Sequence, residues 1–235
     1  SVRASRWTSN KMLDDDKGVN NAMLWARFYR KFTDDVGVYA AGHVGVEDLG
    51  ESNRDRNRLR EGYVDLRLNQ WDLRIGKQII AWGRADRINP TDNLTPRDFT
   101  LLVPEEDDNR FGSIALRTKL AIGEQHSLHA IWLPNFRPHR YPVPLPAGFG
   151  MEKDIPDDAD NFAVKFEQSG GRVDWSVSYY YGYDLVPDWR IKANALPALV
   201  AQATHHKIQV LGLDGATTAG PYGIRWEFAY TRTRD

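Results

Sequence analysis

The residues of this sequence that could do chemistry are charged and polar side chains that recur at alternate positions. They carry both signs, and a ring of both signs can set up a transverse field across a water-filled passage, where the lining charge decides ion preference. The predicted lining residues are Arg27, Tyr29, Lys31, Asp65, Arg67, Arg74, Gln78, Arg117, Lys119, Lys165, Glu167, Arg225 and Glu227. Two interpretations stay open: a slightly anion-favouring passage, or charges that pair across strands and fill a narrow interior.

No pattern typical of an enzyme accompanies these charges. The sequence has no cysteine, and it shows no Ser-His-Asp order, glycine-rich phosphate loop or metal-ligand spacing. His205 and His206 are adjacent, so on a strand they point to opposite faces and do not easily share a metal ion. The acidic clusters within 105–108 and 154–160 match no recognised calcium loop. We therefore expect neither catalysis, nor a metal, nor a cofactor.

Composition narrows the class of partner. The 235 residues include 31 Lys plus Arg against 32 Asp plus Glu, so the formal charge of -1 gives no basic excess for nucleic acid. No run approaches the ~18 apolar residues of a transmembrane helix. Aromatic residues nevertheless make up 11 % of a chain whose mean hydropathy is -0.57. Nucleic-acid binding and helical membrane spans are therefore not expected.

The elements that must position the charged residues are β-strands, because apolar and polar residues alternate strictly over many segments. In one of them, Val64 and Leu66 alternate with Asp65 and Arg67. The alternating segments include 21–32, 63–68, 71–79, 113–120, 162–167, 173–179 and 224–231. We expect about eleven strands in a single all-β domain that occupies residues 1–235.

The connections between these strands alternate between short and long. Short links are expected at 33–36, 69–70, 121–126, 168–171 and 216–220, and long ones at 14–20, 48–58, 83–110, 134–160 and 184–205. Short turns at one rim and long loops at the other are typical of transmembrane β-barrels of the outer-membrane type. The loops 83–110, 134–160 and 184–205 are expected to be extracellular or to fold into the lumen.

Strand length and aromatic placement favour an antiparallel transmembrane β-barrel over a soluble β-sandwich, whose strands alternate as well. Strands approach the ~9–11 residues that cross a bilayer. Aromatic residues such as Trp71, Trp132 and Tyr230 fall near strand ends, where interfacial girdles lie. Bacterial single-chain barrels have even strand numbers. We therefore expect the eleven strands to be part of a larger barrel.

Two segments of the long connections have helical character. Thr95 followed by Pro96 could begin a short helix through Phe99 and Leu102. That loop could narrow the lumen, or it could be a surface loop held by Asx and proline turns. Between Ala193 and Ala203 the sequence NALPALVAQA could plug or gate the lumen, contact a partner, or pack against the rim.

One stretch carries a family resemblance. In IGKQIIAWGRADRINPTDNLTPRDF the matching positions are Gly76, Lys77, Gln78, Trp82, Gly83, Asp86, Asn89, Pro90 and Asp92, with Lys77 where arginine is commoner. The stretch resembles the signature of an uncharacterised proteobacterial outer-membrane family, domain of unknown function number 1302. YYYGYDLVPD from Tyr179 and GLDGATTAGPYGIRWEFAY from Gly212 are similar to later parts of that family. The resemblance implies a porin-like barrel in the outer membrane of a Gram-negative bacterium, and it implies no particular substrate.

These observations predict a porin-like channel of the bacterial outer membrane, for passive diffusion of ions or small hydrophilic or amphipathic solutes. Its surroundings would be outer-membrane lipid and lipopolysaccharide, and a partner protein in the lumen or at the rim stays open. The cationic wall would consist of Arg27, Arg67, Arg74, Arg117 and Lys119. Two alternatives stay open: a barrel that serves as scaffold for an export or electron-transfer complex, and a soluble β-sandwich binding module.

Overall fold

In the part of the chain that the structure describes, the regular elements are fifteen strands and one short 3-10 helix, Glu106–Asn109. The computed structural model describes residues 1–8, 18–49, 52–55, 58–85, 89–103, 105–143, 149–156, 159–192 and 199–234. Within these ranges the protein is all-β, as the alternation of apolar and polar residues predicts. The described part of the chain holds no helix with the length and apolar character of a membrane span.

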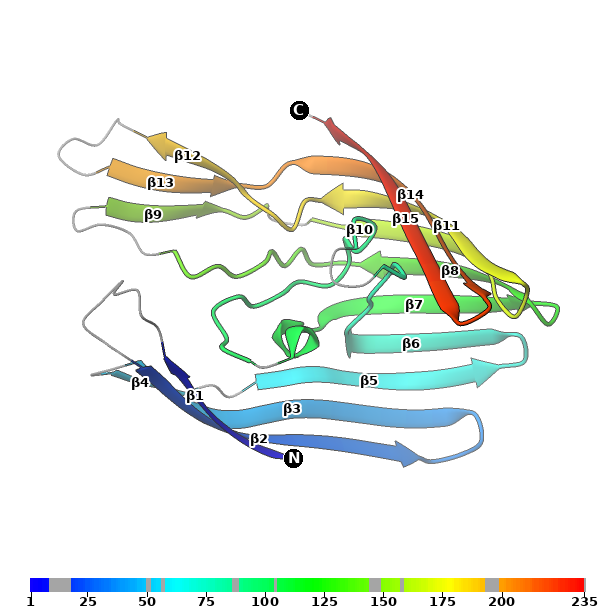
Figure 1. Cartoon of the computed structure of the whole chain (residues 1–235), viewed down its shortest axis with the longest axis horizontal. Helices are drawn as coiled ribbons and strands as arrows, with labels where there is room; N and C mark the ends of the chain where they lie inside the picture. Colours follow the sequence, from blue (N-terminus) through cyan, green and yellow to red (C-terminus); the bar gives the residue numbers. More distant parts are fainter. Residues whose placement is uncertain are drawn as a thin grey trace.

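Twelve strands form one antiparallel sheet with the order β1-β2-β3-β5-β6-β7-β8-β10-β11-β14-β15, in which β4 pairs with β3 alone (Figure 1). Their bounds are β1 Val2–Thr8, β2 Gly18–Lys31, β3 Val36–Leu49, β4 Ser52–Asp55, β5 Arg58–Leu68, β6 Trp71–Gln78, β7 Ser113–Ile122, β8 His126–Leu133, β10 Asn161–Gln168, β11 Val173–Tyr183, β14 Lys207–Ala219 and β15 Tyr222–Arg234. The eleven strands of the main path agree with the predicted number. The closed barrel is not seen, because β1 and β15 are the two edges of an open sheet.

The connections alternate as the sequence predicts. All five short links are turns at the same end of the sheet, on the right in Figure 1, and the long connections lie at the opposite end. Asn69, Gly123, Gly170 and Gly220 adopt positive φ values of 55, 62, 84 and 61° in four of these turns. Tight hairpin turns require this left-handed backbone, which glycine and asparagine adopt most easily.

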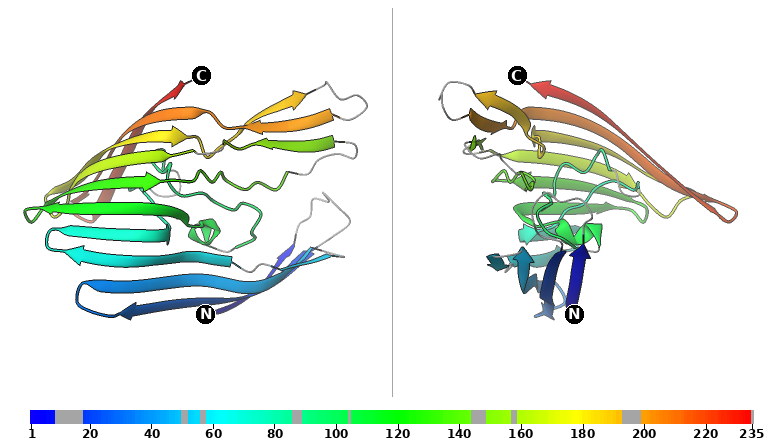
Figure 2. Two further views of the ribbon diagram at one scale, coloured as in Figure 1. Left: turned by 180° about the vertical axis from the view of Figure 1, so that it is seen from behind. Right: turned by 60° about the vertical axis from the view of Figure 1, so that its left-hand side comes forward.

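Two of the predicted long loops contain strands. A separate three-stranded sheet, with the order β12-β13-β9, lies beyond the long-connection end of the main sheet (Figure 2). It consists of β9 Phe149–Asp154 from the 134–160 connection, with β12 Asp188–Lys192 and β13 Leu199–Thr204 from the 184–205 connection. The helical character expected up to Ala203 is therefore wrong from Leu199 onward, since pairing with β9 and β12 outweighs local propensity. Residues 193–198 lie outside the described ranges.

The main sheet has one apolar face and one charged face. Residues that pair across neighbouring strands share a face, and the row Val64, Ile75, Leu116, Trp132 and Phe162 runs through five strands by such pairing. This apolar face is the exposed one: 49 % of Ile75 and 46 % of Phe162 are accessible. The predicted two-faced strands are confirmed, with their apolar side chains pointing outward.

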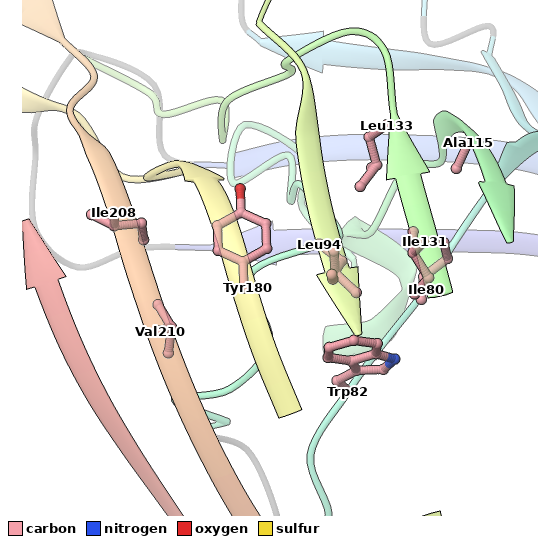
Figure 3. Packing of buried hydrophobic residues seen from close by; sticks show 10 residues of the cluster. Ile80, Trp82, Leu94, Ala115, Ile131, Leu133, Tyr180, Ile208 and Val210 are labelled. Carbon is pink, nitrogen blue, oxygen red and sulfur yellow. The ribbon is translucent and has the colours of Figure 1, made fainter. Parts of the chain in front are cut away.

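The hydrophobic core lies on the charged side of the sheet, under the connection between β6 and β7, residues 79–112, which we call the inner loop. Ile80, Trp82 and Leu94 of the inner loop are buried against apolar residues of the strands (Figure 3). The partners on the strands are Ala115, Ile131, Leu133, Ala163, Tyr180, Ile208 and Val210. The inner loop therefore covers part of the polar face. That it narrows a lumen stays a prediction, because the described sheet is open.

The short helix expected after Thr95 is absent from the described residues 96–102. Thr95 does not cap a helix, because its hydroxyl donates to the Ile80 carbonyl oxygen at 2.6 Å and accepts from the Ile80 N–H at 2.8 Å. Arg97 and Asp98 instead form isolated bridges with Arg110 and Arg140. Long-range pairing therefore replaces the local hydrogen bonds that a helix would need.

Leu94→Ala should lower the free energy of unfolding by about 2–5 kcal/mol, because it leaves a cavity in this core. Leu94 is 3 % exposed, whereas Ile191 on β12 is 69 % exposed. Ile191→Ala is therefore the matched control and should cost far less. Urea titration followed by intrinsic tryptophan fluorescence measures both values. Equal losses would contradict the placement of the core under the inner loop.

Candidate functional site

All thirteen predicted lining residues lie on the polar face of the main sheet. Pairing links Asp65 to Arg74 and Arg74 to Arg117, so these three side chains form a row across β5, β6 and β7. Lys119 and Lys165 belong to a parallel row, because both pair with His129 on β8. The sequence therefore predicts correctly which side chains share the polar face.

Several cations on this face are paired with acids on the neighbouring strand or in the adjoining turn. Arg74 holds Asp65 with two hydrogen bonds, from Nε to Oδ1 at 2.7 Å and from Nη2 to Oδ2 at 3.1 Å. Arg67 Nε lies 3.3 Å from Asp72 Oδ1, and Lys31 Nζ lies 2.8 Å from Asp34 Oδ1. For Arg74 and Arg67 the cross-strand pairing that the sequence left as an alternative is what the structure shows, whereas Lys31 pairs with an acid of the adjoining turn.

Arg117 and Lys119 differ from these paired cations. Within the described ranges no carboxylate oxygen lies within ion-pair distance of either side chain, although their neighbours Arg74, Arg67 and Lys31 are all paired. Both cations line a cavity of about 420 Å³ at the short-turn end of the polar face. The other charged residues of its lining are Lys31, Asp34, Asp35, Asp65, Arg67, Asp72 and Arg74. Five cations and four acids therefore meet in this cavity.

Arg27 faces a different space. It lines a larger cavity of about 970 Å³, which also contacts Arg3, Trp25, Arg60 and Glu61. This cavity lies beside the inner loop, since Asp107 and Arg110 belong to its wall. The predicted cationic wall is thus divided between two cavities, and Tyr29 lies in the lining of the smaller one.

Glu227 anchors the inner loop to β15. Its Oε2 accepts the N–H groups of Arg84 and Ala85, each at 3.1 Å. Its Oε1 accepts the N–H of Thr91 at 2.9 Å and the hydroxyl of the same residue at 2.7 Å. Hydrogen bonds to a charged acceptor are about twice as strong as those between neutral groups. Four of them on one carboxylate hold the inner loop against the sheet at Arg84, Ala85 and Thr91.

Two glycines make this close approach possible. Gly83 has a φ of +93°, and a Cβ at this position would lie 2.5 Å from Oε2 of Glu227. A Cβ on Gly212 of β14 would lie 2.6 Å from the Thr91 side chain. Larger residues at these two positions would push the inner loop away from the sheet.

Arg84 joins the inner loop to three acids on three different strands. Its guanidinium forms ion pairs with Glu167 of β10, with Asp214 of β14 at 2.8 Å and with Asp174 of β11 at 3.9 Å. Glu167 also lies 3.5 Å from Lys165 and 3.4 Å from His129. Glu167 and Lys165, both predicted as lining residues, are therefore largely enclosed beneath the inner loop.

The sequence alone misses Arg84, Asp214 and Thr91. Arg84 directly follows the Trp82-Gly83 pair of the family-like motif, but nothing in its local sequence indicates acids more than 80 positions away. Asp214 does alternate with apolar neighbours in LGLDGA, and this alternation is the one signal that places it on the polar face. Loop residues have no such periodicity, so their partners appear only in the folded chain.

The motif residues serve the inner loop in different ways. Gly76 has a φ of +130° and allows close packing against Tyr63, while Gln78 is buried and donates to the Ala115 carbonyl. Trp82 belongs to the core, and its ring lies 5.5 Å from Lys165 Nζ. Asp92 pairs with Arg110 and Asn89 donates to the Trp82 carbonyl.

Two further motif residues have other surroundings. Lys77 points to the apolar side of the sheet, where it donates to the Leu59 carbonyl, and Pro90 is exposed. Asp86 lies outside the described residues.

Comparisons with known proteins give no relative: the sequence matches no family model and no curated protein. The resemblance noted above therefore depends on the quoted residues alone. In the described part of the chain, no three His, Cys, Asp or Glu side chains are placed to hold a metal ion. Chemically, the polar face offers a fixed loop and a cavity in which Arg117 and Lys119 have no acid partner among the described residues.

Glu227→Gln should release the anchor, because the amide replaces one acceptor oxygen with a group that donates. Hydrogen exchange of the Arg84, Ala85 and Thr91 amides should then accelerate roughly 10- to 100-fold, as expected from losing hydrogen bonds to a charged acceptor. Glu124→Gln, in the exposed β7–β8 turn, is the matched control. Unchanged exchange at all three amides would mean that Glu227 does not hold the inner loop.

Proposed function

We propose that the protein is a porin-like channel of the bacterial outer membrane, through which ions or small polar or amphipathic solutes diffuse passively. The observation that supports this most directly is the exposed apolar face of the main sheet, opposite a charged face that carries cavities. A soluble sheet normally buries its apolar face and wets its polar one. This sheet has the reverse arrangement, which suits a wall between lipid and water.

The apolar face extends over most of the sheet rather than over a local patch. Exposed apolar residues follow one another through in-register pairs from β2 to β15, for example Leu24 with Val44 and Leu213 with Phe228. Soluble monomers rarely expose a contiguous apolar patch larger than a few hundred Å². Lipid is the occupant that would cover such a face along whole strands.

Strand length and aromatic residues agree with a bilayer. Several strands have 11 to 14 residues, among them β2, β5 and β15, and ~9–11 tilted residues cross the hydrocarbon core. Phe32, Trp71 and Tyr222 are exposed at the short-turn end, in the position of an interfacial aromatic girdle. In this proposal the short turns face the periplasm and the long connections face the exterior.

The open edges require closure in this proposal. A strand edge in hydrocarbon leaves unpaired N–H and C=O groups, each of which costs several kcal/mol. Among the described strands, β1 pairs with β2 alone and β15 pairs with β14 alone. We propose that further strands complete the barrel around the polar face. The alternative of a soluble β-sandwich finds less support, because no described strand packs on the apolar face.

Membrane placement can be tested with Val164→Arg. Val164 lies in the middle of β10 on the apolar face, where arginine should cost about 2–4 kcal/mol if the side chain meets the bilayer midplane. Urea titration in lipid vesicles measures this loss. Ile191→Arg, on the small sheet outside the proposed membrane region, should cost little. In a water-exposed sheet Val164→Arg would be neutral or would raise solubility, and this result would overturn the membrane assignment.

The sign of the charge in the channel can be tested by reversing Arg117 and Lys119, the lining cations for which the described residues supply no acid partner. The double variant Arg117→Glu, Lys119→Glu should shift the reversal potential in a planar bilayer under a salt gradient toward cation selectivity. Arg74 is a poorer target than the sequence suggests, because Asp65 already neutralises it. Arg172→Glu, in the exposed β10–β11 turn, is the control. Steady conductance with an unchanged reversal potential would contradict the assigned lining, and silence of the inserted wild type would contradict the channel.

A further inference from the structure

A third cavity lies away from the proposed lining, between the 136–143 segment and the small β12-β13-β9 sheet. Its volume is about 400 Å³, within the range of roughly 300–1,000 Å³ that is typical of small-molecule sites. The views of Figures 1 and 2 place the small sheet at the long-connection end. We call this space the rim pocket. Its lining shares no residue with the contacts of Glu227 or with the cavity of about 420 Å³ that Arg117 and Lys119 line.

The floor of the rim pocket is aromatic and buried. Phe136 and His205 are 8 % and 7 % exposed, and their rings meet edge to face with centroids 4.9 Å apart. Phe111 and Ala203 complete the buried part of the lining. Such a floor offers ring faces to an apolar group.

The walls continue the aromatic character. Tyr141 stacks on Phe99 with centroids 5.1 Å apart, and His139 meets the same ring edge to face at 5.5 Å. Trp189 of β12 forms the opposite wall with Met151 of β9. Both of these side chains are more than one third exposed, so their apolar surfaces are available to a ligand.

The rim of the pocket is cationic. Arg137, Arg140 and Lys153 belong to the lining, and no described lining residue carries a carboxylate. Arg140 is partly engaged, since its Nη1 lies 3.6 Å from Asp98. Arg137 and Lys153 form no ion pair with any described residue, and both are exposed. Two cations at the mouth of an aromatic pocket are complementary to an anion on an apolar body.

The two histidines of the pocket do not supply this positive charge. Burial lowers the pKa of His139 to about 4, and its Nδ1 accepts the N–H of Arg97 at 2.9 Å, which requires an unprotonated nitrogen. Burial also lowers the pKa of His205, whose Nδ1 donates to the Asp184 carbonyl at 2.7 Å. Both imidazoles are therefore neutral at pH 7, and the charge of the pocket comes from Arg137, Arg140 and Lys153.

We propose that the rim pocket binds an aromatic monocarboxylate, with the ring on Phe136 and Trp189 and the carboxylate at Arg137 and Lys153. The neutral aromatic floor favours a ring over a sugar or an inorganic ion, because it offers few hydrogen-bonding groups. The cations favour a carboxylate over a neutral ring. This inference goes beyond the proposed channel, since binding at the rim requires no conduction.

Calorimetry with 2-naphthoate tests the site on the purified protein, in lipid nanodiscs or in plain buffer if the protein needs no lipid. Wild-type protein should bind 2-naphthoate at least about tenfold more tightly than 2-naphthalenemethanol, which keeps the ring and lacks the charge. The double variant Arg137→Gln, Lys153→Gln should remove this preference. Trp189→Ala should weaken both probes by about tenfold.

Arg190→Gln is the matched control. Arg190 follows Trp189 on β12, is exposed, and is not part of the pocket lining, so its loss of charge should leave both affinities unchanged. No binding of 2-naphthoate, equal affinity for the two probes, or an Arg190→Gln effect equal to that of the double variant would each overturn the proposal. Conductance is measured separately, so a silent channel with intact binding would refute the channel alone.

Discussion

The carboxylate of Glu227 holds a loop that leaves the sheet at β6, and this contact organises the rest of the molecule. A single open sheet can bury apolar residues only where the chain returns over one of its faces. Here the inner loop returns over the charged face, and Glu227 together with the acids around Arg84 fixes it there. Trp82 and Leu94 then form a core with the strands. The opposite face keeps its apolar side chains exposed as a consequence.

Local sequence predicts the strands well because alternation is a property of neighbouring residues. Val64, Leu66, Asp65 and Arg67 indicate the correct faces without knowledge of their partners. The same information cannot close a barrel, since closure depends on which edges meet. It also misassigns segments such as 199–203, whose strand character comes from pairing with β9 and β12. The local pattern therefore predicts the strands and their two faces, whereas long-range pairing decides which strands meet and where a sheet ends.

The charged face illustrates a similar limit. The sequence predicts correctly that thirteen residues share one face, yet it treats their charges as equivalent. In the structure Arg74 is neutralised by Asp65, whereas Arg117 in the next strand has no acid partner among the described residues. Strand register and side-chain length decide which cation has an acid within ion-pair distance and which cation does not. The inner loop adds Arg84, which forms ion pairs with acids of β10, β11 and β14. The alternating pattern gives no indication of these pairs, because Arg84 lies in a loop.

The anchor also joins parts of the chain that lie far apart in the sequence. Most strands pair with a neighbour that follows after a turn of a few residues, so each hairpin can form early and independently. The contact between Arg84 and Glu227 spans 143 residues and needs β15 in place. Docking of the inner loop therefore closes a much longer stretch of chain than any hairpin turn does, and it costs more chain entropy. Before the inner loop docks, the carboxylates of Glu227, Glu167 and Asp214 lack the loop partners that hold them in the folded chain.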